Sequence, residues 1–223
     1  MSEFLSRSIK MLGEDKIASF KDKKILIAGL GGVGGTAFEA LVRSGFDNFI
    51  LIDFDTVDES NLNRQLLFTR DDIGKTKVEV AKKRALSINP DAKIEIINAK
   101  VENTLNINAD LSFIVDCIDY VPGKLTLMKF AIENNIYIVS SMGMGNRIDP
   151  QVVKLTTLNK TEGDPLARKI RYECRQLGLD LSKINVVTSS EVPLIKSPEP
   201  GSMMMVPSTA GLIIAKFVIS NIK

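Results

Sequence analysis

Carboxylates, arginines, lysines and glycines are the residues with which this 223-residue chain could do chemistry, because it contains no histidine. Without an imidazole, the Ser/His and Cys/His arrangements of nucleophilic catalysis and histidine metal sites are excluded. Cys117 and Cys174 are its two cysteines, too few for the paired CxxC sets of a structural zinc site. They do not suggest a secreted disulfide scaffold either, so we expect a cytoplasmic chain.

A glycine-rich turn, GLGGVG at 29–34, separates an apolar stretch from a stretch with helical character. Gly29, Gly31 and Gly34 would let the backbone N–H groups at the start of that helix hold a polyphosphate. Asp53 follows about 20 residues later, at the offset where the acid of a dinucleotide-binding unit meets ribose hydroxyls. The glycines and the acid together favour a nucleotide site over the alternative, a merely tight turn between a strand and a helix.

The polar segment 54–77 departs from an ordinary dinucleotide-binding unit. Arg64 offers a rigid fork for phosphate oxygens, Gln65 a neutral amide, and Lys77 a movable charge at the start of a helix. Two cations favour ATP over NAD, because charge builds up on pyrophosphate as it leaves. In the alternative, both cations are surface charges that pair with nearby acids, namely Asp55, Asp58 or Glu79.

Two more acids, Asp116 and Asp119, follow an apolar stretch at the sheet edge where ligands bind in open α/β folds. Asp119 is the candidate ligand for a Mg²⁺ that bridges ATP phosphates, the alternative being a helix cap. Asp116 is expected to brace the turn or to bind a helix amide. Cys117, directly after the strand, is expected to be a buried small residue.

Apolar periodicity predicts the elements that must bring these residues together. Strands are expected at 24–28, 48–53, 93–99, 111–117 and 136–140, and helices before Gly45 as a C-cap, from Lys77, at 122–134, from Pro165 and at 212–219. This alternation predicts an α/β fold, Rossmann-like, with a doubly wound, mostly parallel sheet and a C-terminal α/β extension. No apolar run reaches the roughly 20 residues that span a membrane.

We expect one domain over residues 1–223 in three parts. A short helical arm occupies 1–20, the nucleotide-binding core 21–150, and an extension for substrate or dimer contacts 151–223. Within the extension, 189–207 is rich in proline and is predicted to be a loop.

Five motifs in order, GLGGVG, LIDFD, SNLNRQ, IGKTK and DCID, resemble the adenylating superfamily of ThiF, MoeB and the ubiquitin-activating enzymes. These enzymes use ATP to activate the C-terminal carboxylate of ubiquitin-like proteins. The resemblance covers about residues 5–150. It implies a phosphate loop at Gly29, Gly31 and Gly34, ribose binding by Asp53, triphosphate contacts from Asn61, Arg64, Gln65 and Lys77, and magnesium at Asp119.

Arg7 sits where the superfamily's N-terminal arm offers an arginine to the ATP of a partner subunit. From the residues alone, Arg7 would be a solvated or paired surface charge. The resemblance instead implies a catalytic contact across a homodimer.

The second half is similar to the branch of the tRNA threonylcarbamoyladenosine dehydratases, the TcdA or CsdL type. The similarity rests on SINP at 87–90, SMGMGNRIDP at 141–150, KTEGDPLARKIR at 160–171 and VVTSSE at 186–191. It implies that ATP activates the threonyl carboxylate of a modified tRNA adenosine, and that ring closure then expels AMP. The missing CxxC pairs depart from the sulfur-carrier activators of the thiamine and molybdopterin pathways.

A locally basic helix is expected from Pro165, with Arg168, Lys169, Arg171 and Arg175 as candidate contacts to tRNA phosphates. The alternative is a solvated helix face. Cys174, on the same helix, is a weaker candidate for a thioester-forming thiol. The resemblance leaves open a monovalent cation (Na⁺ or K⁺) near 141–149 and a sulfur-transfer partner, a cysteine desulfurase or sulfur acceptor.

Other functions remain compatible with the sequence. The second hypothesis is adenylation of the C-terminus of a ubiquitin-like or sulfur-carrier protein. The third is an NAD-dependent oxidoreductase or an inactive nucleotide-binding module. The formal net charge of +2 neither proves nor excludes an RNA partner.

Overall fold

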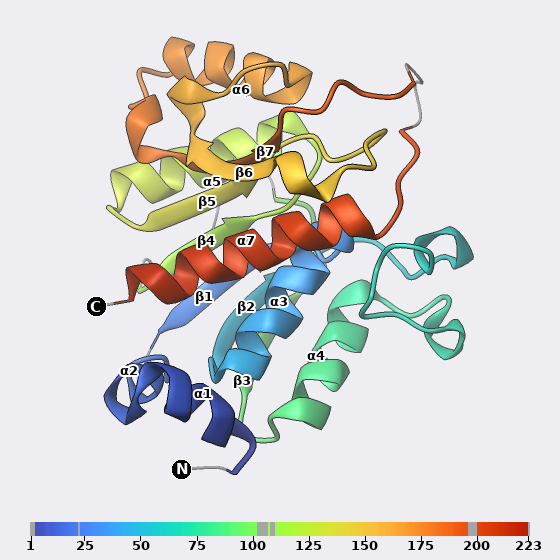
Figure 1. The fold of residues 1–223 in the computed structure, drawn as a ribbon, viewed down its shortest axis with the longest axis vertical. Helices are drawn as coiled ribbons and strands as arrows, with labels where there is room; N and C mark the ends of the chain where they lie inside the picture. Colours follow the sequence, from blue (N-terminus) through green and yellow to red (C-terminus); the bar gives the residue numbers. More distant parts are fainter. Residues whose placement is uncertain (1–2, 22, 102–106, 108–109, 196–199, 223) are drawn as a thin grey trace.

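A central sheet with helices on both faces organises the chain in a computed structural model, which describes residues 3–21, 23–101, 107, 110–195 and 200–222 (Figure 1). Its seven strands lie in the order β3-β2-β1-β4-β5-β7-β6, and only the β6–β7 pair is antiparallel. The predicted Rossmann-like, mostly parallel sheet is therefore confirmed. The strands are β1 (Lys24–Ala28), β2 (Asn48–Ile52), β3 (Lys93–Ile97), β4 (Phe113–Asp116), β5 (Tyr137–Ser141), β6 (Val153–Thr157) and β7 (Asn185–Ser189).

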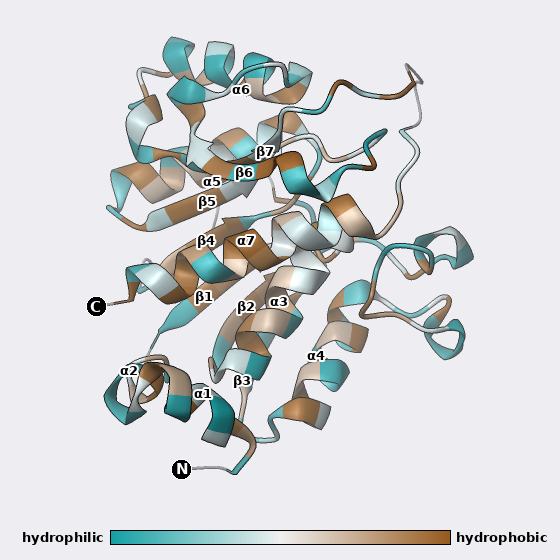
Figure 2. Ribbon diagram, in the orientation of Figure 1, coloured by the Kyte–Doolittle hydropathy of each residue, from teal (hydrophilic) through white to brown (hydrophobic). Residues whose placement is uncertain are grey.

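Five longer helices cover the sheet: α3 (Gly32–Ser44), α4 (Lys77–Ile88), α5 (Val121–Glu133), α6 (Pro165–Gln176) and α7 (Met205–Asn221). Successive strand residues point to opposite faces, so both faces of β1 are buried: Ile25 and Ile27 pack in one apolar cluster with α3, α4 and α7, and Leu26 in another with α5 and α6. Figure 2 shows the strands mostly brown and much of α6 teal. None of the helices formed by the described residues is long and apolar enough to cross a membrane.

The N-terminal arm is two short helices rather than one, α1 (Ser6–Leu12) and α2 (Glu14–Ala18). They separate at Gly13, whose φ of 86° is unfavourable for other residues. The arm packs at the C-terminal end of α3, where an added Cβ on Gly45 would meet the Leu5 side chain at 3.1 Å. The phenyl rings of Phe20 and Phe46 stack there with centroids 4.4 Å apart. The arm is thus attached to the end of α3 remote from the glycine turn.

The expected C-terminal helix at 212–219 begins earlier, at Met205, so the last three residues of the predicted loop 189–207 belong to α7. α7 packs against α3 at close range. A Cβ on Gly211 would lie 2.5 Å from the Val33 carbonyl oxygen, so the glycine is what permits this approach. Because the glycine turn leads directly into α3, the packing of α7 against α3 also supports the turn.

Candidate functional site

A cavity of about 330 Å³ opens at the C-terminal ends of β1, β2 and β4, the switch point at which doubly wound sheets bind ligands. The chain leaves β1 and β4 in opposite directions there, so their following loops separate and leave space. Eight of the predicted nucleotide-site residues line the cavity. They are Gly29, Gly31, Asp53, Asn61, Arg64, Gln65, Lys77 and Asp119.

The three glycines of the turn differ in what they do. Gly29 has a φ of 86°, and an added Cβ would lie 2.7 Å from the Cys117 carbonyl oxygen. Gly34 is buried, and its Cβ would lie 1.8 Å from the Gly29 carbonyl oxygen. Gly31 alone has open space on its cavity side, with the nearest atom, Gln65 Nε2, 3.8 Å from a Cβ. Gly29 and Gly34 therefore set the turn's shape, and Gly31 leaves room for a ligand.

Asp53 connects the end of β2 to the glycine turn. Its Oδ2 accepts a 2.6 Å hydrogen bond from the Leu30 N–H, and its Oδ1 accepts one of 2.9 Å from the Asp55 N–H. Burial raises the pKa of this carboxyl, and the two backbone hydrogen bonds act against that shift. The carboxylate oxygens have further acceptor capacity, which is what ribose hydroxyls require.

Gln65 is 6% exposed, and its Oε1 is the buried side-chain polar atom that has no hydrogen-bond partner among the described residues. An unsatisfied buried acceptor costs on the order of 1–3 kcal/mol. A ligand that donates a hydrogen bond to it removes that cost. This atom, the helix N-terminus behind the turn and Asp53 together fit a nucleotide.

The two predicted phosphate-binding cations have different surroundings. Lys77 is 5% exposed and pairs with Asp55 Oδ2 at 2.7 Å, the pairing that the surface-charge interpretation expected. That pair nevertheless lines the cavity wall. Arg64 donates to the Ser60 carbonyl at 2.7 Å and to the Asn63 Oδ1 at 3.0 Å, both neutral acceptors. Asp55 was expected only as a possible partner of a surface charge, and the structure places it in the cavity wall.

Asp119 is exposed at the mouth of the cavity. Over the described part of the chain, no cluster of three or more acids, cysteines or histidines could hold a metal by itself. Mg²⁺ in phosphate-transfer sites needs only one or two carboxylates beside the phosphates, so Asp119 fits that role. Asp116, as expected, braces the turn after β4. Its Oδ1 accepts a hydrogen bond of 3.2 Å from the Ile118 N–H, and its Oδ2 lies 3.1 Å from Nζ of the fully buried Lys124.

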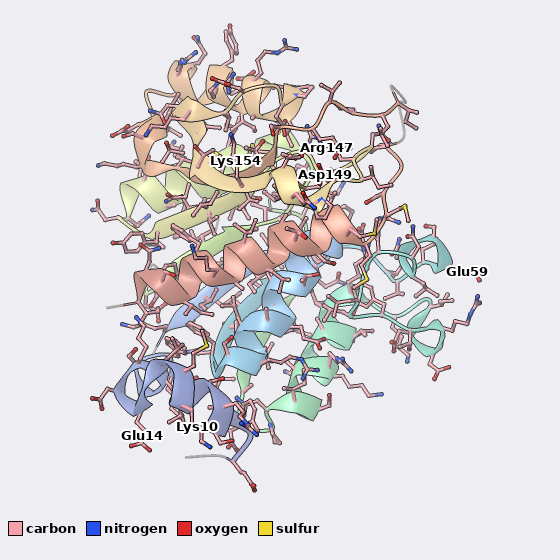
Figure 3. The ribbon with its side chains drawn as sticks, in the orientation of Figure 1. Lys10, Glu14, Glu59, Arg147, Asp149 and Lys154 are labelled. Atoms are coloured by element: carbon pink, nitrogen blue, oxygen red, sulfur yellow. The ribbon has the colours of Figure 1, made fainter. Side chains whose placement is uncertain are left out.

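Arg7 does not lie at this cavity. It is exposed on α1, beyond the C-terminal end of α3, and a 13-residue helix is about 20 Å long. In Figure 3, Lys10 and Glu14 mark the arm at one end of the molecule, and Arg147 and Asp149 lie far from them. Arg7 therefore cannot contact a ligand in its own chain's cavity in this conformation.

Three of the four predicted basic residues on α6 are free to meet a polyanion. Arg168, Lys169 and Arg175 are exposed, whereas Arg171 donates to the Thr161 carbonyl at 2.5 Å. The three exposed residues keep the predicted basic surface of α6. Arg171 instead attaches α6 to Thr161.

Cys174 is fully buried on the inner face of α6, with its Sγ 3.8 Å from Met128 Sδ. Burial raises the pKa of its thiol to about 11, so at pH 8 about one thiol in a thousand is ionised. Cys117 is partly buried, and burial beside Asp116 raises the pKa of its thiol as well. Neither position suits a nucleophile.

We expect Cys174→Ala to keep catalytic activity within about twofold and to lose on the order of 1 kcal/mol of stability through the small cavity it leaves. Iodoacetamide labelling of the native protein at pH 8, read by peptide mass spectrometry, should leave Cys174 unmodified, with labelling appearing after denaturation. Rapid native labelling with loss of activity would revive the thioester interpretation.

A scan against protein-family models matches the ThiF family over residues 5–191. The chain belongs to the ThiF family. Among curated ThiF relatives, it is 33% identical to the tRNA threonylcarbamoyladenosine dehydratase of Bacillus subtilis, over 97% of this chain and 93% of the relative. It is 36% identical to the dehydratase 2 of Saccharomyces cerevisiae, over 91% of this chain but 46% of the yeast protein.

A solved structure of the same kind matches the whole fold of this ThiF chain. The Escherichia coli tRNA N6-threonylcarbamoyladenosine dehydratase, crystallised with ATP, superposes with a TM-score of 0.90 at 31% identity, covering 99% of this chain and 93% of the other. The likeness therefore includes β6, β7 and α7 as well as the first 150 residues.

Proposed function

We propose that this chain is an ATP-dependent tRNA threonylcarbamoyladenosine dehydratase that cyclises the modified adenosine through carboxylate adenylation. One observation carries the proposal. The cavity at the switch point places a glycine turn, an acid, two cations and an exposed aspartate around one ligand volume, in a chain that matches dehydratases over nearly its full length.

The first step forms an acyl-adenylate. A carboxylate oxygen of the threonyl group attacks the α-phosphorus of ATP, the bond from that phosphorus to the bridging oxygen breaks, and pyrophosphate leaves with the electron pair. Arg64 and Lys77 would offset the charge that grows on pyrophosphate, and Asp119 would hold Mg²⁺, which neutralises phosphate charge when bound. No step needs a titrating imidazole.

The second step closes the ring. A nucleophilic atom of the same substituent attacks the activated acyl carbon and loses its proton to solvent, and AMP leaves with the former carboxylate oxygen. Because the nucleophile is tethered to the acyl group, the reaction is intramolecular and gains the corresponding rate advantage. The substrate loses the elements of water.

The test is conversion of tRNA that carries the modified adenosine. With ATP and Mg²⁺, nucleoside mass spectrometry should show a product lighter by one water, and ¹⁸O in the substrate carboxylate should appear in AMP. Absence of the product would refute the dehydratase assignment. Pyrophosphate exchange stimulated by a glycine-ended carrier protein, and not by tRNA, would support the protein-tail hypothesis. Binding of NAD without ATP would support the oxidoreductase.

We also propose roles for the two main parts of the chain and for the basic residues of α6. Residues 21–150 bind the nucleotide and 151–223 supply substrate and dimer contacts, with the exposed cations of α6 meeting tRNA phosphates in the cytoplasm. A monovalent cation near 141–149 and a sulfur-transfer partner remain predictions from the resemblance.

We also propose a homodimer in which Arg7 serves the partner's ATP, since Arg7 lies on the order of 20 Å from its own glycine turn. Arg7→Ala and Arg64→Ala should each be inactive alone. Co-expressed, they should recover about a quarter of wild-type activity, because half the dimers are mixed and one of the two sites in each is intact. Lack of recovery in purified mixed dimers would refute the contribution in trans.

A further inference from the structure

A second cavity, of about 520 Å³, adjoins the nucleotide cavity. The two share one wall, the segment Cys117, Ile118 and Asp119 that follows β4. The other walls come from the loop after β5, the start of α6 and prolines 193 and 200. A group bound here therefore lies next to the proposed phosphate-transfer site, on the far side of Asp119.

The lining of the second cavity combines apolar side chains with a buried ion pair, Arg147 and Asp164. Val33, Met142, Met144 and Leu166 supply apolar surface. Arg147, also in the lining, is 5% exposed. Its Nε donates to the Glu191 carbonyl at 3.1 Å, and its Nη1 lies 3.5 Å from Asp164 Oδ2. Its Nη2 makes no hydrogen bond to any residue that the structure describes.

The polar walls of this cavity are held in place by their own hydrogen bonds. Asp164 accepts from the Gly143 N–H at 3.0 Å and caps α6 through the Ala167 N–H at 3.0 Å. Glu191 accepts from the Ile148 N–H at 3.0 Å. The guanidinium of Arg147 is thus fixed between two anchored segments, so it is preorganised to donate to a ligand.

The loop after β5 is also tied to the segments that form the far wall. Asn146 donates its N–H to the Gly201 carbonyl at 2.7 Å, accepts from the Gly201 N–H at 2.7 Å through Oδ1, and accepts from the Leu194 N–H at 2.8 Å through its carbonyl. Its φ of 59° is one that asparagine tolerates better than most residues. The cavity therefore has a defined shape on both sides of Arg147.

We propose that this cavity holds the flipped-out adenine and carbamoyl group of the substrate, with its carboxylate directed to the Asp119 wall and Arg147 donating to its polar edge. The inference rests on the proposed function and names the part of tRNA that this site takes. Enzymes that act on a nucleobase extrude it into a pocket with apolar walls and a few fixed polar groups. A protein tail that bound by strand addition would need an open sheet edge, whereas β4 and β5 beside this cavity are both internal strands of the sheet.

The test uses a substitution that fills the second cavity and leaves the nucleotide cavity unchanged. Leu166→Trp adds bulk at the start of α6, and the matched control Leu177→Trp adds it just beyond the other end of α6, where Leu177 is 50% exposed. With an unhydrolysable ATP analogue, wild type should bind modified tRNA about tenfold tighter than the same tRNA without the modification. Leu166→Trp should abolish that preference, with unchanged affinity for unmodified tRNA and for ATP. Leu177→Trp should keep it.

Arg147→Lys keeps the positive charge of the side chain, so it tests the role of Arg147 in binding the modified tRNA apart from its role in supporting the fold. It should raise KM for modified tRNA about tenfold with an unchanged Kd for ATP. The cavity proposal is overturned if wild type converts modified tRNA and Leu166→Trp retains both the binding preference and the rate. If wild type itself neither prefers nor converts modified tRNA, the proposed function is what fails.

Discussion

Arg64→Ala is expected to lower the rate of acyl-adenylate formation by about 10³-fold, the scale seen when an arginine that stabilises phosphoryl-transfer charge is removed. The side chain reaches the cavity from a short polar segment and binds only neutral oxygens of Ser60 and Asn63. Its removal therefore leaves no buried carboxylate unpaired, and the melting temperature should change little. ATP–pyrophosphate exchange and thermal denaturation measure the two effects.

Arg70→Ala is the matched control for Arg64→Ala. Arg70 belongs to the same polar segment, but its side chain is 77% exposed and pairs with Glu59 at 2.7 Å on the surface. Exposed pairs contribute little to stability, so this variant should exchange pyrophosphate like wild type. If Arg64→Ala kept wild-type exchange, the assignment of Arg64 to the triphosphate would be wrong.

Asp119→Asn is expected to reduce Mg²⁺-dependent adenylation by at least about 10²-fold, because the substitution removes the carboxylate charge and leaves a side chain of nearly the same size. ATP affinity measured without Mg²⁺ should rise or stay unchanged, since a negative charge beside the phosphates is lost. Titrating the metal in the exchange assay should show a higher Mg²⁺ requirement. This shift separates a metal ligand from a residue that only shapes the loop.

Asp110→Asn controls for a general loss of acidic charge. Asp110 makes a surface ion pair with Lys24, at 3.2 Å, before the start of β4, away from the residues that line the nucleotide cavity. Its substitution should leave the Mg²⁺ dependence unchanged. A normal metal requirement in Asp119→Asn would contradict the proposed metal role.

The fold was largely predictable because its signals are local. Short apolar strands alternate with helices, and an acid follows the glycine turn at the spacing typical of a dinucleotide-binding βαβ unit. The boundaries were less predictable: the expected strands 93–99 and 111–117 are shorter in the structure, and the arm breaks at Gly13. Strand ends depend on where the neighbouring strand stops pairing, which single-sequence periodicity does not contain.

The sequence pointed to most of the residues that line the candidate nucleotide cavity because their side chains, such as those of Arg64 and Asp119, have distinctive chemistry. What escaped prediction depends on long-range packing. The Asp55–Lys77 pair was expected only between surface charges, whereas Lys77 is buried and the pair lines the cavity. Arg147 meets Asp164 and Glu191 from different elements. The motif SMGMGNRIDP supports the family resemblance, but only the folded chain shows that its arginine is buried in a cavity wall.

With ATP and the modified nucleoside bound as proposed, the wall common to both cavities, residues 117–119, would couple the two ligands thermodynamically. A shift of residues 117–119 on filling one cavity changes the shape of the other, so ATP would alter the affinity for modified tRNA. Linkage then requires the tRNA to alter the affinity for ATP by the same factor. In the proposed arrangement, this three-residue segment would tie the use of ATP to the presence of an acid that can receive the adenylyl group.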